Sequence, residues 1–162
     1  MDFAPFPHVR VSLSVALIMA AASVAGLPGV AVVASVAVAG DYAAHRKAWF
    51  KVVFIEGMLL LAGAAYVAVL EGFSVGGPDD WPSVRAAAVV GSTANFAVNS
   101  GLVALAVALD SGRRPESLWL DAFTGLLPHY VLPGVLAAAM ASAYGGWGLA
   151  GLSVVLAPLP MA

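Results

Sequence analysis

The sequence contains no cysteine, and this absence excludes disulfide bonds and thiolate metal sites. Charge is scarce as well: Asp, Glu, Lys and Arg form 10% of the chain, whereas water-soluble domains contain about a quarter. The seven Lys and Arg are outnumbered by nine Asp and Glu, which gives a net charge of −2. A generally basic nucleic-acid-binding protein is therefore excluded, and we expect no nucleic acid partner.

Apolar residues take the place of the missing charge. They form 62% of the 162 residues, the mean hydropathy is +0.96, and the few charges fall in clusters between apolar runs. Too few charges remain to cover a soluble surface, so we interpret the chain as an integral membrane protein in a lipid bilayer. A spanning helix needs about 20 apolar residues. Residues 1–162 are therefore expected to form a single all-α domain, a polytopic transmembrane helical bundle of about six helices.

The N-terminal apolar run resembles a signal peptide at first sight. Arg10 precedes it, and residues 37–39 read Ala-Val-Ala, a small-residue cleavage pattern. The run is about twice the usual length of a signal core, however, and Leu-Pro-Gly at residues 27–29 divides it. We therefore predict two short helices, at residues 11–26 and 28–44, which form a helical hairpin.

The remaining apolar runs are separated by charged or glycine-rich turns. Trp49, Phe50 and Tyr66 lie near the ends of one run, which suggests an aromatic belt at the membrane surface. The last run is barely long enough to span, so a five-span arrangement is the alternative to six. We expect further helices at residues 48–70, 82–109, 128–144 and 149–159, and a short amphipathic interfacial helix at residues 116–127.

The positions of the cationic residues predict an orientation. Cytoplasmic loops carry an excess of Lys and Arg, and six of the seven cations fall on one side of the six-span arrangement. This arrangement places both termini in the cytoplasm and the polar loop at residues 71–81 outside. Arg85 lies on the outer side, and the six that agree are Arg10, Arg46, Lys47, Lys51, Arg113 and Arg114.

Three polar residues share one face of the helix expected at residues 82–109. Asn95 and Asn99 are four residues apart, and Ser92 precedes Asn95 by three. Polar groups at membrane depth are costly unless paired, so this row is a candidate site. Two interpretations stay open, namely hydrogen bonds between helices that fix their packing, and contacts to a small ligand or ion.

Two further polar residues are candidates for the same site. Glu56 lies inside the helix expected at residues 48–70, either as a paired carboxylate near the interface or as a proton- or substrate-linked group. His129 begins the fifth span, where it either bonds a carbonyl or senses pH or a ligand. Asp41 and His45 are spaced for a local salt bridge. No spacing of ligating residues suggests a metal site, so neither a metal nor a cofactor is expected.

Small residues form two rows at a spacing of four, which predicts close contact between the helices that carry them. The first row leads into Asn95, and the second lies in the fifth span. The rows consist of Ala87 and Gly91, and of Gly134, Ala138 and Ser142.

Several segments together resemble a known membrane region. The run NFAVNSGLVALAVAL at residues 95–109 is followed by SGRRP at 111–115, Trp119, and LPHY at 127–130. The segments VSLSVAL at 11–17 and KVVF at 51–54 contribute to the same likeness. The chain resembles the multi-helix membrane region that precedes bacterial HD-GYP phosphodiesterase and GGDEF diguanylate cyclase domains. It departs from that family in having only ten residues before Val11 and none of the catalytic signatures.

The resemblance implies a non-enzymatic sensory or anchoring module of the bacterial cytoplasmic (inner) membrane. Such a module passes a signal to a cytoplasmic output partner, which would be a signalling enzyme. The alternative is a small transporter or a substrate-binding subunit resembling the S component of energy-coupling importers. The sequence leaves a small-molecule ligand and further copies of the chain open as additional partners. No convergent acid, base and nucleophile is recognisable, so we expect no enzymatic activity.

Overall fold

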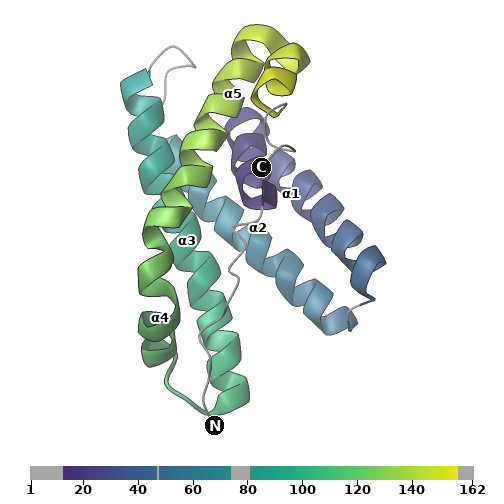
Figure 1. Ribbon diagram of the computed structural model, residues 1–162, viewed down its shortest axis with the longest axis vertical. Helices are drawn as coiled ribbons and strands as arrows, with labels where there is room; N and C mark the ends of the chain where they lie inside the picture. Colours follow the sequence, from purple (N-terminus) through teal and green to yellow (C-terminus); the bar gives the residue numbers. More distant parts are fainter. Residues whose placement is uncertain (1–12, 47, 74–80, 157–162) are drawn as a thin grey trace.

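The computed structural model describes residues 13–46, 48–73 and 81–156, and this part of the chain contains helices and no strand. The all-α class is confirmed. Five α-helices lie within these described residues, so the expected number of about six is not confirmed. Figure 1 shows their arrangement. They are α1 (Leu13–His45), α2 (Trp49–Gly72), α3 (Trp81–Ser111), α4 (Pro115–Phe123) and α5 (Leu127–Leu156), with a 3₁₀ turn, η1 (Thr124–Leu126), before α5.

Three of these helices are long and apolar enough to cross a membrane. The qualifying segments are Val15–His45 of α1, all of α2, and Ala86–Ser111 of α3. Their length and composition support a membrane protein, as the scarcity of charge predicts. With nine residues, α4 is too short to be a span.

Helix α1 is broken at Gly26, the residue at which the first helix was predicted to end. Its φ of 59° and ψ of −148° belong to a backbone region that is essentially restricted to glycine. The chain folds back after this point (Figure 1). A Cβ atom at Gly29 would lie 2.5 Å from the carbonyl oxygen of Ala21, although eight residues of continuous helix span about 12 Å. The two halves of α1 therefore form a hairpin.

Helix α5 contains a second break, at Gly148. This residue has φ of 57° and ψ of −142°, nearly the same backbone conformation as Gly26. The sequence Gly-Gly-Trp-Gly at residues 145–148 predicted a tight turn here. Figure 1 shows the last part of α5 turning away from the first.

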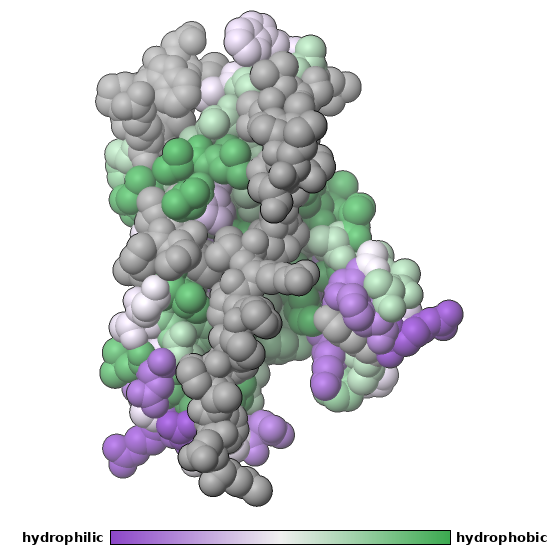
Figure 2. Space-filling view, in the orientation of Figure 1, coloured by the Kyte–Doolittle hydropathy of each residue, from purple (hydrophilic) through white to green (hydrophobic). Residues whose placement is uncertain are grey.

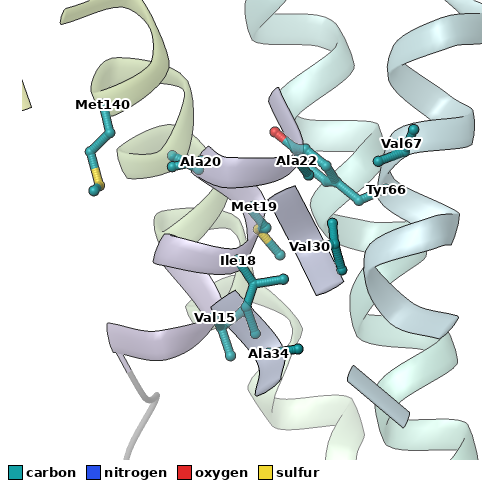
Figure 3. Close-up of a cluster of buried hydrophobic side chains, with 11 residues drawn as sticks. Val15, Ile18, Met19, Ala20, Ala22, Val30, Ala34, Tyr66, Val67 and Met140 are labelled. Carbon is teal, nitrogen blue, oxygen red and sulfur yellow. The ribbon is translucent and has the colours of Figure 1, made fainter. Parts of the chain in front are cut away.

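The hydrophobic core is built around the α1 hairpin (Figure 3). Met19 and Val30, one from each half, are fully buried and pack with residues of α2 and α5. At Gly63 of α2 a Cβ atom would overlap the Val30 side chain, so the two helices touch closely at this point. Small residues thus allow the close approach that stabilises helix pairs in lipid.

Tyr66 of α2 is buried at the contact with α3, and its predicted position in an interfacial belt is wrong. The side chain is 1% exposed, and its hydroxyl lies 3.3 Å from that of Ser23 on α1. A Cβ atom at Gly91 of α3 would lie 2.7 Å from the Tyr66 ring. Because Gly91 has no side chain, the Tyr66 ring can occupy the space beside it. Trp49, by contrast, is 75% exposed at the start of α2, as expected of a belt residue.

Charged residues gather at one end of the described structure. Figure 2 shows hydrophilic side chains in the lower part of the view, below a mainly apolar body. The connection from α1 to α2 lies at this end, and so does the connection from α3 to α4 (Figure 1). Arg113 at this end lies 3.3 Å from Asp121, and the predicted contact between Asp41 and His45 is present at 3.0 Å.

Candidate functional site

Helix α3 carries the polar row predicted from the sequence, and the structure buries its first two members. Ser92 is fully buried and Asn95 is 3% exposed. Asn99 lies one turn further along α3, so the three side chains follow one face of the helix. This face points into the bundle, as the burial of Ser92 and Asn95 shows.

Ser92 joins α3 to both α1 and α5. Its hydroxyl donates to the carbonyl oxygen of Ala88 and lies 3.9 Å from the sulfur of Met19. On the other side, a Cβ atom at Gly134 would overlap the Ser92 hydroxyl and lie 2.9 Å from the Ala88 carbonyl oxygen. The predicted close contact between α3 and α5, the helices that carry the two small-residue rows, is confirmed. The two helices approach each other closely at Gly134. Gly91, however, faces Tyr66 of α2 and not α5.

Asn99 carries the one fully buried side-chain acceptor for which the described residues supply no donor. Its Oδ1 atom is buried and accepts no hydrogen bond in the part of the chain that the structure describes. Leaving a buried acceptor without a donor costs about 1–3 kcal/mol. A hydroxyl, amide or ammonium group of a ligand would remove this cost. The Asn99 Oδ1 atom is therefore available to accept a hydrogen bond from a ligand.

Glu56 does not join the polar row. Its Oε1 atom accepts a hydrogen bond from the hydroxyl of Ser35 at 2.8 Å, so it lies at the contact between α1 and α2. This is a paired carboxylate, which is one of the two interpretations left open by the sequence. The backbone of His129 belongs to α5, but its side chain lies outside the described residues.

A second group of contacts, around Trp119 of α4, was missed by the sequence analysis. The indole nitrogen donates to the hydroxyl of Ser100 at 2.7 Å, and that hydroxyl donates to the carbonyl oxygen of Phe96 at 2.6 Å. The Trp119 and Phe96 rings are 6.2 Å apart between centroids and tilted by 52°. These contacts hold α4 against α3 (Figure 1). The spacing of apolar residues in α4 predicted an apolar face without indicating which helix it meets.

An open groove of about 480 Å³ lies along the contact between α3 and the first turns of α4. Its α3 wall consists of small residues and its α4 wall carries an indole and a carboxylate. The groove is lined by Ala97, Gly101, Ala104, Pro115, Glu116, Trp119 and Leu120.

The described residues contain no group of three or more His, Asp or Glu side chains that could hold a metal ion. The features with capacity to bind are the polar row on α3 and the groove beside α4. No protein-family model, curated protein or solved structure matches this chain. The function is therefore argued from these two features.

Proposed function

We propose that the protein is a non-enzymatic sensory or anchoring module of the bacterial inner membrane. It would bind a small molecule in the bundle and pass the signal to a cytoplasmic output partner. The observation that carries this proposal is the buried, unpartnered Oδ1 atom of Asn99 in a helix apolar enough to span the membrane. Unpaired polar groups at membrane depth are costly, and those that persist usually have a function.

The contacts of α3 with α4 link the polar row to the charged end of the molecule, so that a movement at the row could be transmitted to that end. Asn99 is next to Ser100 in the chain, and Ser100 holds Trp119 of α4 by a 2.7 Å hydrogen bond. A ligand that moved α3 at Asn99 would therefore act on α4 directly. The α3–α4 connection carries Arg113 and Arg114, which the positive-inside rule assigns to the cytoplasm.

The arrangement of the two charged connections supports the proposed orientation. The α1–α2 connection, with Arg46, and the α3–α4 connection lie at the same end of the molecule (Figures 1 and 2). With about six spans, this end is cytoplasmic and both termini are on the same side. A cytoplasmic C-terminus suits the resemblance to membrane regions that precede cyclic di-GMP enzymes.

Replacing Asn99 by alanine tests the binding site. We expect Asn99→Ala to lose any small molecule that the wild-type protein retains after gentle purification from its native membrane. The free energy of unfolding should be unchanged or raised by about 1–2 kcal/mol, because the variant removes an unsatisfied buried acceptor. Mass spectrometry of the extracted protein measures the first effect, and denaturant titration followed by circular dichroism measures the second.

Thr93→Ala is the matched control for this experiment. The Thr93 hydroxyl is exposed and donates only to the Val89 carbonyl oxygen of its own helix, at 2.9 Å. A marked loss of stability in Asn99→Ala would show that Oδ1 has a structural partner, and the binding site would then be discarded. Co-purification of a signalling enzyme after cross-linking tests the output role separately.

The same unpartnered acceptor favours one second candidate, a substrate-binding transport subunit resembling the S component of energy-coupling importers. A buried acceptor on a helix long and apolar enough to span the membrane is suited to capture of a substrate as well as to sensing. Uptake of the retained molecule into vesicles, together with co-purification of an ATPase instead of a signalling enzyme, would favour this candidate.

A further inference from the structure

The groove between α3 and α4 is chemically distinct from the polar row. Ala97 and Gly101 line the groove, whereas Asn99 lies between them in sequence and faces the bundle. Residues two apart on a helix are separated by about 200°, so the groove and the row are on opposite faces of α3. Any ligand of the groove is therefore additional to a ligand at Asn99.

The lining of the groove favours a cation. Glu116 is its one ionisable residue, and Trp119 supplies its one aromatic surface. Carboxylates attract ammonium groups through charge, and aromatic rings attract them through their electron-rich faces. The other lining residues are apolar, with three small residues on α3 that leave room for an occupant. An anion in this groove would meet the Glu116 carboxylate without a compensating cation from the lining.

The groove lies next to the charged connection from α3 to α4. This connection carries Arg113 and Arg114, and cationic connections of membrane proteins lie at the membrane surface. Helix α4 begins at Pro115, directly after the connection, and Trp119 is five residues, or about 8 Å along a helix, beyond Arg114. Trp119 therefore lies within reach of the lipid headgroups, at the depth where tryptophans are enriched.

We propose that this groove binds the headgroup of a phospholipid that carries an amine, such as an ethanolamine lipid. The Glu116 carboxylate pairs with the ammonium group, and the Trp119 indole forms the aromatic wall. Arg114 precedes the lining residue Pro115 in the chain and is exposed, so it is available to the lipid phosphate. The small residues of α3 accommodate the start of the acyl chains.

The experiment compares two lipids with identical acyl chains, phosphatidylethanolamine and phosphatidylglycerol. Full-length protein is loaded with an equimolar mixture, and the retained lipid is counted by native mass spectrometry. We expect the wild-type protein to retain the ethanolamine lipid at least about threefold over the glycerol lipid, as expected for one exposed ion pair and one aromatic contact. Glu116→Gln should bring the two lipids to equal retention.

Glu71→Gln is the matched control, because Glu71 is an exposed carboxylate at the opposite end of the bundle. It should keep the wild-type preference. Gly101→Leu is a second variant; a Cβ atom at Gly101 has no neighbour within 4 Å, so the leucine would fill the groove and displace both lipids. Equal retention of the two lipids by the wild type would overturn the proposal. So would a preference that survives Glu116→Gln, or dimerisation through the groove. None of these outcomes bears on the binding site at Asn99.

Discussion

Gly134→Ala is expected to destabilise the protein by about 1–3 kcal/mol, and Gly134→Leu by more. A Cβ atom at Gly134 would overlap the Ser92 hydroxyl and lie 2.9 Å from the backbone oxygen of Ala88. The hydroxyl could rotate away, but the backbone oxygen belongs to a helix packed on several sides. Helix α5 would therefore have to move away from α3. Denaturant titration of the full-length protein, followed by circular dichroism, measures the loss.

Gly146→Ala and Gly146→Leu are the matched controls for this prediction. Gly146 lies in the same helix, and a Cβ atom there has no neighbour within 4 Å. These variants should change the free energy of unfolding by less than about 1 kcal/mol, with a gain expected for alanine because of its higher helix propensity. If the variants at Gly134 and Gly146 had equal stability, the close contact between α3 and α5 would be refuted.

Much of the fold could be predicted from the sequence because glycines mark the points where helices are broken. Gly26 ends one helix at the predicted residue, and Gly148 lies in the predicted glycine-rich turn. Both residues have positive φ, a conformation that favours glycine, so they could be recognised without knowledge of tertiary contacts. The apolar runs also predicted α2 and α3 to within a few residues. The number of helices was less predictable, since a break within a helix and a loop between two helices have the same composition.

Which face of each helix is packed was harder to predict. Side chains that face lipid and side chains that face the core are equally apolar, so the hydrophobic pattern does not distinguish them. Tyr66 was assigned to the interface because it lies near a helix end, yet it fills the space left by Gly91. Small and polar residues were the better guide. The spacing of Ser92 and Asn95 placed them on one face, and the structure buries both.

The candidate site was predictable in part for the same reason. Residues on one helix have a fixed geometry, so the row on α3 followed from spacing alone. Glu56 is on another helix, and its partner Ser35 is 21 residues away, so no local rule could assign it. Trp119 is likewise held by Ser100, 19 residues earlier in the chain. Contacts between helices depend on rotation and tilt, which the sequence does not encode in any short pattern.

Gly26→Val is expected to destabilise the protein by about 1–3 kcal/mol, even though Gly26 has space around it. Its nearest contact, the Pro28 ring, would be 4.0 Å from a Cβ atom, so steric overlap with neighbours is not the cause. The cost comes from the backbone, because φ of 59° with ψ of −148° is a region that residues with a side chain rarely occupy. Relief of this strain would straighten α1 and separate Met19 from Val30 in the core.

Gly40→Val separates this backbone effect from the general cost of valine in a helix. Gly40 lies in the second half of α1, and a Cβ atom there has no neighbour within 4 Å. The control should lose little or no stability, because valine is no worse than glycine inside a helix. Equal stability of the two variants would mean that the chain does not depend on a reversal at Gly26. A selective loss in Gly26→Val would instead identify the hairpin as the element around which α2 and α5 assemble, since its two halves supply the buried centre of the core.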